Sequence, residues 1–481
     1  MTNLSADDLS FLFFHCNEQS NNFSLPLVGP IGISTLSDGT SHGRGLVSTR
    51  TVQAGELLFA MKPHLHAPID AVYRLWCTKG ARGCRARLEE VAEGVLLEQM
   101  KECLQHGDEK RILSVMLQLG EEKDEELKLT HLPPEVYLDI LLGRTNANMV
   151  ISSNVNFIQD GTDTNLLRII RRNAFGPDYH NYDTMEKTWN SKTESTSLED
   201  ATPYSRVLGL YPLAAMINHS CSPNAVRVFA GEIMVVHACD VIPKGSEIVW
   251  SYIVPSQPYP VRSHEIFSKY GFRCRCDRCT QEKSAYEQVP TLQDQLAQVD
   301  RFNGQSTSPI PTPSTLKELR RLKDHIENLL TSEKLSNQMK RFLRVGYLNF
   351  YLFYFNNALY GMHQDSDHDA ESHGTILTLA AQLHFALVSC NNACIAHLSI
   401  LHMAYELAAT ITRSSSSGGG NVKTKSMVGS TQFWTEQLKR AHMIRYGALG
   451  QSLENTREVM KHTRVVVRNI DGLLQAQWRF I

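Results

Sequence analysis

Four cysteines in two separate segments have the residue type and the spacing to bind one metal ion. Cys221 follows Asn218-His219-Ser220, and 53 residues later the chain carries a C-x-C-x2-C arrangement of Cys274, Cys276 and Cys279. Structural zinc sites take four ligands, usually cysteine or histidine, so three close thiols need a fourth from elsewhere. Cys221 fits that role, and a shared zinc would fold the tail over the Asn-His segment. The alternative is a set of buried small residues, which does not require such clustering.

Short strands broken by glycine are expected to position the N-terminal part of any site. Ile31–Leu36 is a small apolar run, and Gly43-Arg44-Gly45 leads into the run Val52–Phe59. Glycine at positions 43 and 45 lets a ligand approach the backbone closely, because no side chain is in the way. By itself, the Gly-x-Gly pattern indicates only a turn.

Four motifs follow one another in a fixed order along the chain. They are Gly43–Leu46 (GRGL), Leu213–Asn224 (LAAMINHSCSPN), Glu247–Tyr252 (EIVWSY) and Tyr270–Cys276 (YGFRCRC). In this order they resemble the SET-domain protein-lysine methyltransferases, most closely the SET-and-MYND branch, over residues 28–284. The resemblance implies S-adenosylmethionine as the cofactor and a lysine side chain of a protein or peptide as the substrate.

The resemblance also assigns seven residues to the cofactor. They are Arg44, Gly45, Asn173, Asn218, His219, Tyr252 and Phe272. Asn173 stands in a segment that resembles the family's N-S-F motif, with Ala174 in the Ser place. Without the flanking motifs, Asn218 and His219 would indicate a polar turn.

Methyl transfer from a sulfonium to an amine is an in-line displacement. Alignment of the bound cofactor with the bound lysine can therefore lower the activation barrier by several kcal/mol, as an order of magnitude. The resemblance places the phenol of Tyr252 at the transfer point, as the catalytic group. Tyr252, Tyr270 and Phe272 would line the lysine channel, since aromatic walls suit the apolar stem and attract cationic amines. Local sequence alone favours packing roles for these aromatic residues.

The zinc-binding MYND module of that branch has seven cysteines and one histidine in tight pairs. In the corresponding region this chain has only Cys77, Cys84, Cys103 and His106, at spacings that do not pair. Packing residues in a helical insertion are the favoured interpretation, and one ill-formed metal site is the alternative. The sequence therefore predicts a relative of this branch without the MYND module.

Composition places the chain in the ordinary globular class. It has 481 residues, 42% of them hydrophobic, and a formal charge of −2. That charge predicts no general attraction to nucleic acid, and no nucleic-acid-binding motif stands out. No apolar segment reaches the length of a membrane span. Scattered cysteines fit a reducing compartment, so the cytoplasm, the nucleus or both are expected.

The changes in composition predict five successive regions. They are an N-terminal extension (1–27), a SET domain (28–261), a zinc-closed post-SET segment (262–284), a linker (285–315) and a helical C-terminal domain (316–481). The SET domain is expected to contain a helical insertion (76–145) and a polar surface loop (177–202).

The C-terminal region shows helical periodicity. Leu319, Leu322, Ile326, Leu329 and Leu330 recur three and four positions apart. Paired helices here resemble the tetratricopeptide-like (TPR-like) region of the family, although no 34-residue period is evident. For six histidines of this region, core or solvated positions are favoured over a metal site: His363, His368, His373, His384, His397 and His402.

The sequence thus predicts an α+β chain, in which a β-rich SET domain with small sheets and a knotted core precedes an all-helical domain. The expected function is methylation of a protein lysine, on a histone or another protein, with about one structural zinc. A catalytically weak SET-fold scaffold that binds peptides is the alternative. By resemblance the chain is expected to act as a monomer, with chromatin or chaperones as partners. All the proposed metal and cofactor ligands lie upstream of Gln281, so a chain ending there is expected to keep both groups.

Overall fold

The computed structural model describes residues 26–36, 43–68, 88–105, 163–175, 207–230, 233–294, 313–331, 333–355, 370–390, 392–417 and 427–447, with the single positions 72, 75 and 138. The polar loop 177–202, most of the insertion 76–145 and most of the extension 1–27 lie outside these residues. The chain divides into two compact units. The first contains Met1–Asn218 and Arg227–Val249, and the second contains His219–Val226 and Trp250–Ile481.

The first unit is built around an antiparallel sheet with the strand order β1-β4-β10-β9. Its strands are β1 (Leu27–Val28), β4 (Leu57–Met61), β9 (Ala225–Ala230) and β10 (Ile233–Ala238). Every residue of β4 and β10 is buried, as the continuous apolar sequences LLFAM and IMVVHA require.

Two smaller sheets also lie in the first unit. In one, β2 (Ile31–Leu36) pairs antiparallel with β3 (Gly43–Ser48) in register from Ile31↔Ser48 to Leu36↔Gly43. The other has the order β5-β7-β6, made of Leu65–Pro68, Val207–Leu210 and Ala174–Phe175. The glycine-broken strands predicted from the sequence are thus present as several small sheets.

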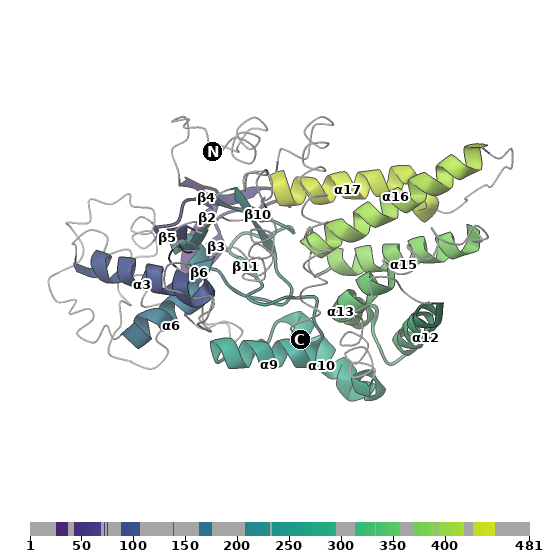
Figure 1. Cartoon of the computed structure of the whole chain (residues 1–481), viewed down its shortest axis with the longest axis horizontal. Coiled ribbons are helices and arrows are strands. Elements are labelled where there is room, and N and C mark those ends of the chain that lie inside the picture. The colour runs from purple at the N-terminus through teal and green to yellow at the C-terminus, as the bar shows by residue number, and fades with distance from the viewer. Residues whose placement is uncertain are drawn as a thin grey trace. The chain divides into compact units, whose positions relative to one another are not determined.

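Two helices pack against the β5-β7-β6 sheet and against each other. Helix α3 (Leu88–Gln105) lies in the expected helical insertion, and α6 (Asp163–Asn173) leads directly into β6 (Figure 1). Their shared apolar core includes Leu96, Met100 and Ile170. The short helix α8 (Pro212–Ala215) then precedes β8 (Asn218–His219), which pairs with β11 (Val249–Trp250).

The second unit is mainly helical. Its elements are α9 (Tyr259–Tyr270), α10 (Asp277–Gln288), α12 (Pro313–Leu330), α13 (Asn337–Gly346), α15 (Ala370–Val388), α16 (Ile395–Ser417), the 3-10 turn η4 (Met427–Gly429) and α17 (Thr431–Tyr446). Helices α15, α16 and α17 pack side by side, and α13 packs against both α15 and α10 (Figure 1). Helix α10 runs across position 284, the predicted end of the post-SET segment.

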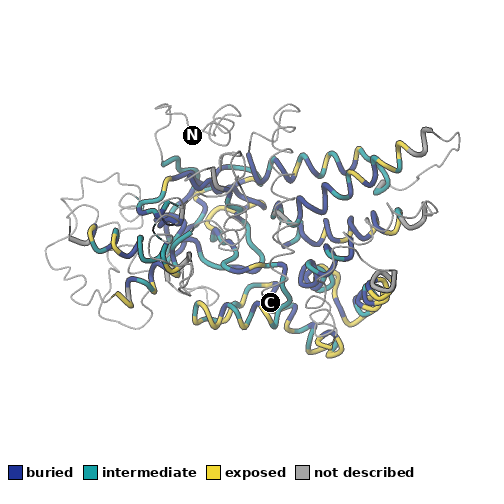
Figure 2. The backbone as a smooth tube through the Cα atoms, in the orientation of Figure 1, coloured by how far each residue is buried: buried dark blue, intermediate teal, exposed yellow. Residues whose placement is uncertain are grey.

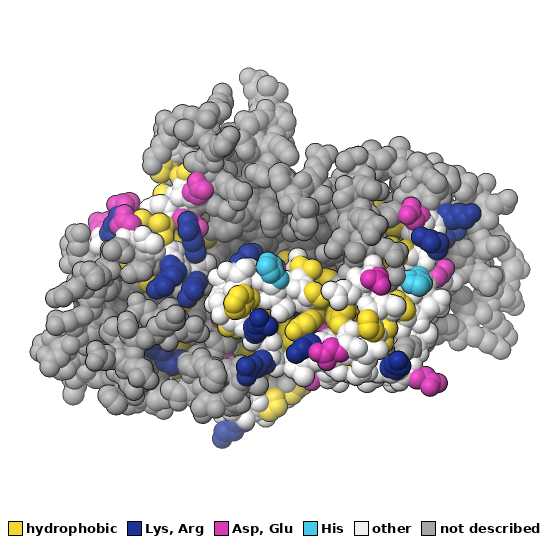
Figure 3. Space-filling model, turned by 90° about the horizontal axis from the view of Figure 1, so that it is seen from below, with side chains coloured by type: hydrophobic (Ala, Val, Ile, Leu, Met, Phe, Trp, Pro, Cys, Tyr) yellow, Lys and Arg dark blue, Asp and Glu magenta, His cyan; other side chains and the backbone are white. Residues whose placement is uncertain are grey.

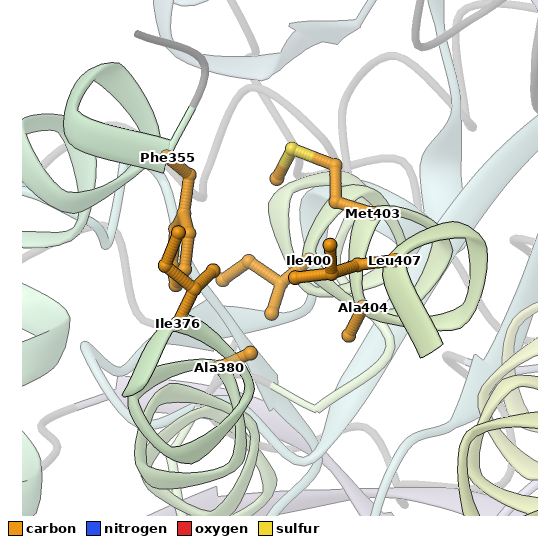
Figure 4. A pocket seen from close by; sticks show the side chains of 7 residues that line it. All are labelled: Phe355, Ile376, Ala380, Ile400, Met403, Ala404 and Leu407. Atoms are coloured by element: carbon orange, nitrogen blue, oxygen red, sulfur yellow. The ribbon is translucent and has the colours of Figure 1, made fainter. Parts of the chain in front are cut away.

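The burial pattern follows the periodicity of the helices (Figure 2). In α12 the predicted apolar stripe is buried at Leu319, Leu322, Ile326 and Leu330. A small apolar hollow lies between α15 and α16, and Phe355 lines one side of it (Figure 4). Its walls are hydrophobic throughout: Phe355, Ile376, Ala380, Ile400, Met403, Ala404 and Leu407.

Three of the six predicted histidines belong to the core of the helical region. His384, His397 and His402 are buried, His373 is half-buried, and His363 and His368 lie outside the described residues. His384 Nδ1 and His397 Nε2 are 2.8 Å apart, and the backbone N–H of Ala393 donates to His397 Nδ1. A hydrogen bond between the two rings lets each neutral imidazole satisfy the other inside the core.

The described helices include none that is both long and apolar enough to cross a membrane. On the face seen in Figure 3, Lys and Arg side chains of the described residues lie among acidic and hydrophobic ones.

Candidate active site and metal centre

The four predicted metal-binding cysteines converge in the second unit. Their Sγ atoms all lie within 4.8 Å of one another, and those of Cys221 and Cys279 are 3.4 Å apart. All four thiols are free of disulfide bonds. A tetrahedral Zn²⁺ with Zn–S bonds of about 2.3 Å needs sulfur atoms about 3.8 Å apart. The donor set and its spacing therefore fit one structural zinc ion.

Local structure explains how three cysteines so close in sequence can face one point. Helix α9 ends at Gly271, whose φ of 80° is left-handed, and the chain there turns sharply toward Cys274. Cys276 is the N-cap of α10 and Cys279 lies in its first turn. The positive end of the helix dipole favours negative sulfur at these two positions.

Three buried charged residues surround the cysteine cluster. Arg262 and Arg278 are fully buried and Glu282 is 1% exposed. Both guanidinium groups bind the same carboxylate: Arg262 Nη2 lies 2.7 Å from Glu282 Oε2, and Arg278 Nε lies 2.8 Å from Oε1. Arg262 Nη2 also lies 3.9 Å from Cys279 Sγ, and Arg278 Nη1 donates to the carbonyl of Cys221.

Two positive guanidinium groups share one negative carboxylate, so the three residues together have a net charge of about +1. An unpaired buried charge is strongly destabilising, so a negative group is needed beside them. Four thiolates around a divalent zinc have a net charge of about −2 and supply it, whereas four neutral thiols do not. The buried arginines thus provide a second reason why the cluster fits a metal–thiolate centre.

Hydrogen bonds within the cluster shift the pKa values of its thiols in opposite directions. Hydrogen bonds from Cys274, Cys276 and Cys279 lower the pKa of the Cys221 thiol well below its ordinary value, whereas the pKa values of Cys274 and Cys279 are raised, first of all by their hydrogen bonds to Cys221. Burial alone lowers the pKa of Arg262, but Glu282 and the sulfurs of Cys221 and Cys279 raise it well above its ordinary value. Cys221 and Arg262 therefore stabilise each other's charged forms.

Next to the cysteines, four rings form a cluster that contains the predicted catalytic tyrosine. The ring centroids of Tyr252 and Tyr270 are 5.0 Å apart, and those of Tyr270 and Phe272 are 6.4 Å apart. His219 lies 5.3 Å from Tyr252 and 6.0 Å from Phe272. The Tyr270 hydroxyl donates to the carbonyl of Tyr252. The structure thus brings together all three residues predicted to line the lysine channel.

The imidazole of His219 has two polar neighbours in this cluster. The backbone N–H of Tyr252 donates to His219 Nδ1 at 3.0 Å, and His219 Nε2 lies 3.3 Å from Cys221 Sγ. The sequence analysis predicted a cofactor contact for this residue and did not predict either bond. The Tyr252 partner is a backbone group 33 positions away, which no motif could have signalled, whereas Cys221 lies two residues away in the same Asn-His-Ser-Cys motif and could have been considered.

In the first unit, hydrogen bonds hold Asn218 beside Arg44, one of the predicted cofactor-binding residues. Its Nδ2 donates to the carbonyl of Arg44 at 3.1 Å and to Glu247 Oε1 at 2.7 Å. Arg44 and Gly45 lie in β3, and Gly45 is buried. Asn218 therefore fixes the position of the Arg44 backbone, a contact that the motif alone did not reveal.

Asn173 makes a hydrogen bond within its own helix. It is 6% exposed at the end of α6, and its Nδ2 donates to the carbonyl of Ile169 at 3.0 Å. This is a local side-chain bond to the carbonyl four residues earlier in the same helix. The predicted contact of Asn173 with the cofactor stays a prediction.

Sequence reasoning missed the buried arginines. Arg278 and Glu282 are spaced i,i+4 inside the C-x2-C helix, which could have indicated an ion pair on one helix face. Arg262 lies on a different helix and carries no local signal. Of the residues considered as MYND remnants, Cys103 is buried in the core around α3, and Cys77, Cys84 and His106 lie outside the described residues.

Comparison with known proteins identifies the region that holds the motifs upstream of the C-x-C-x2-C segment. Residues 43–253 match the SET domain family model. The chain is 48% identical over 73 residues to Histone-lysine N-methyltransferase ASHR1 of Arabidopsis thaliana, which is 15% of either protein. It is 38% identical over 90 residues to Histone-lysine N-methyltransferase SET5 of Saccharomyces cerevisiae, 18% of this chain and 17% of SET5.

A longer match extends beyond the SET motifs. The chain is 25% identical over 279 residues to N-lysine methyltransferase SMYD2-A of Xenopus laevis, 53% of this chain and 63% of that protein. The chain therefore spans about a sixth of the length of the first two relatives and less than two thirds of the third. A solved structure of Rubisco LSMT bound to AdoMet overlays with a TM-score of 0.24 at 14% identity, over 98% of this chain and 92% of that one, and supports no statement about the fold. The chain contains a SET domain and is a homologue of the SMYD and SET5 lysine methyltransferases.

Proposed function

We propose that this protein transfers a methyl group from S-adenosylmethionine to a lysine side chain of a protein. The observation that carries the proposal is the cluster of Tyr252, Tyr270 and Phe272, held together beside a metal-binding cysteine centre. Aromatic walls can accept the apolar stem of a lysine and attract its cationic forms. The named activities of the SMYD and SET5 homologues support the same reaction class.

Each aromatic residue would have a separate task. S-adenosylmethionine, when bound, supplies the methyl group as part of a sulfonium. The phenol of Tyr252 would orient the lysine amine and stabilise nearby charge. Tyr270 bonds to the Tyr252 carbonyl, so it would keep that residue's main chain in place while its own ring walls the channel. Phe272 would contribute a third wall and help to exclude water.

The seven cofactor contacts implied by the motifs remain part of this proposal, as does one structural zinc at the four cysteines. Binding through Asn218 is supported by its anchoring to Arg44 and Glu247, which would keep the segment rigid for a ligand. The zinc would act on folding and on the position of Phe272, two residues before Cys274, and not as a Lewis acid on the substrate.

The substrate would be a protein or peptide with an accessible lysine, on a histone or another protein. A monomer, partners in chromatin or among chaperones, and a place in the cytoplasm or nucleus complete the proposal. A TPR-like arrangement of the C-terminal helices and a knotted crossing in the SET core also belong to it. The contact between α10 and α13 supports a role of the helical region in holding the post-SET segment.

The decisive experiment measures methyl transfer by the full chain. Purified protein is incubated with radiolabelled S-adenosylmethionine and an array of lysine-containing peptides, and calorimetry measures cofactor binding in parallel. Label on lysine that disappears in peptides with Lys→Arg changes is the expected result. Cofactor binding without transfer to histones, cell-extract proteins or peptides would favour the scaffold function instead. Failure to bind the cofactor at all would overturn the proposal.

A further inference from the structure

His219 forms a direct link between the cysteine centre and the main chain of Tyr252. On one side, the Tyr252 N–H donates to His219 Nδ1 at 3.0 Å. On the other side, His219 Nε2 lies 3.3 Å from Cys221 Sγ. Cys221 is one of the four clustered thiols. A single side chain thus spans from a metal ligand to the predicted catalytic residue.

The hydrogen-bond partners determine which ring nitrogen of His219 carries the proton. Nδ1 accepts from a backbone N–H, which can only donate, so Nδ1 has no proton of its own. The proton of the neutral ring is then on Nε2, and it points to Cys221 Sγ. A thiolate bound to a metal is a fixed, negatively charged acceptor for this donor. Outer hydrogen bonds of this kind orient metal ligands and commonly change metal affinity by about 10- to 100-fold.

We propose that His219 is a positioning residue that holds the Tyr252 backbone by anchoring it to the cysteine centre. Zinc occupancy and the placement of Tyr252 would then be coupled, because the metal fixes Cys221 and Cys221 fixes the ring. The consequence for methyl transfer rests on the proposed function, whereas the coupling itself does not. The chain would tolerate loss of zinc poorly even though no metal ion touches the substrate.

Two substitutions separate the two bonds of His219. In His219→Asn, the amide oxygen can occupy roughly the place of Nδ1 and accept from Tyr252, but nothing reaches Cys221. In His219→Gln, the longer amide can donate at roughly the place of Nε2, but no acceptor remains for Tyr252. If His219 only packs against its surroundings, both variants should disturb the Tyr252 backbone and the cysteine centre together.

The test measures each neighbour without cofactor or substrate. Zinc affinity is measured by competition with a chromogenic chelator, and the thiolate-to-cobalt absorption band is recorded after Co²⁺ replaces zinc. Hydrogen exchange of the peptide that contains Tyr252 reports the backbone bond. Phe272→Leu is the matched control, since it removes a neighbouring ring and neither hydrogen bond. Circular dichroism identifies which variants are folded.

We expect His219→Asn to lower zinc affinity about 10-fold or more and to shift the cobalt band, while Tyr252 exchange stays nearly native. His219→Gln should keep the cobalt band and accelerate exchange of the Tyr252 amide. Should either variant fail to fold, chelation of zinc from the wild-type protein gives the remaining comparison. Faster exchange at Tyr252 than in α16 after chelation supports the link, and unchanged exchange overturns it.

Native exchange at Tyr252 in folded His219→Gln, or native zinc affinity in folded His219→Asn, would also overturn the proposal. Failure of methyl transfer alone would count against the proposed function and not against this link, since neither readout requires the reaction. If transfer is observed, His219→Gln should lower kcat more than it weakens cofactor binding. The substitution leaves the backbone groups of residue 219 unchanged, and these would still be available to the cofactor.

Discussion

The sulfur atoms of Cys221 and Cys279 lie 3.4 Å apart although 58 positions separate them in the chain. Closing a loop of this length costs on the order of 4 kcal/mol of chain entropy if it is treated as a cross-link. A zinc ion bound by both cysteines would supply binding energy that offsets this cost. The metal would therefore stabilise the segment that contains Tyr252 and Tyr270, because both residues lie inside the closed loop.

Elemental analysis of the purified protein should find about one zinc per chain, since four ligands complete one tetrahedral site. Cys276→Ser should lose most of this zinc, because oxygen is a poorer ligand than sulfur for this site. Cys390→Ala is the control: it removes a buried thiol two residues after α15, outside the cluster. Three zinc ions per chain would restore the MYND interpretation of residues 77–106, and no zinc at all would contradict the metal centre.

Arg262→Met should weaken zinc binding about 10-fold or more and reduce stability by about 3 kcal/mol. The substitution removes a positive charge that lies 3.9 Å from Cys279 Sγ and breaks a buried ion pair with Glu282. Chelator competition and urea unfolding measure the two effects. Arg344→Met provides the matched control, since it breaks a guanidinium–carboxylate pair with Glu327 between α13 and α12. The control should lower stability and leave zinc affinity unchanged. Equal zinc affinity in folded Arg262→Met and wild type would refute the charge argument.

Tyr252→Phe should slow methyl transfer on the order of 100-fold while cofactor binding changes little, because the lost hydroxyl acts mainly on the transition state. Single-turnover kinetics and calorimetry measure the two quantities. Tyr405→Phe is a control that removes a phenol from helix α16, and it should react like wild type. Wild-type turnover in Tyr252→Phe would remove this tyrosine from the catalytic group.

The protein should become less stable as the pH falls from about 6.5 to about 4. Burial lowers the pKa of His384 and of His442 to about 4 and that of His397 well below its ordinary value. In this range the unfolded chain binds protons that the folded chain does not, so each histidine reduces stability by up to about 1.4 kcal/mol per pH unit. Above the unfolded pKa this effect is absent.

Urea unfolding at several pH values measures this dependence. His442→Phe should flatten the slope, because it removes one buried titrating ring and keeps a ring near Tyr446, which His442 contacts at 5.9 Å. His264→Gln, at an exposed position on α9, should leave the slope unchanged. A slope in His442→Phe as steep as in wild type would show that this buried histidine does not contribute.

The structure changes what we expect of a chain truncated at Gln281. All four cysteines precede Gln281, so the sequence suggested that a chain ending there would keep its metal. The structure places Glu282 one residue later, inside α10, where it binds both buried arginines. Such a truncation would leave two buried positive charges without their carboxylate. We therefore expect it to lose zinc, and a truncation tested for metal binding should end beyond α10.

The sequence by itself determined those features whose cause is local. The C-x-C-x2-C spacing, typical of metal ligands, identified Cys274, Cys276 and Cys279. The order of the motifs identified Cys221 and the aromatic residues. The recurrence of apolar residues every three or four positions located the buried stripe of α12. Each pattern reflects a short-range rule of ligand geometry or helix geometry. These rules hold whatever the rest of the chain does.

Only the tertiary structure decided which distant groups share one low-dielectric environment. Arg262 looks like an ordinary helix residue in sequence, yet folding buries it completely beside Cys279 and Glu282. The His219 ring likewise meets the backbone of Tyr252, whose N–H carries no side-chain identity for a motif to record. Burial makes such contacts strong because water no longer competes for them, and burial is a property of the packed chain rather than of any segment.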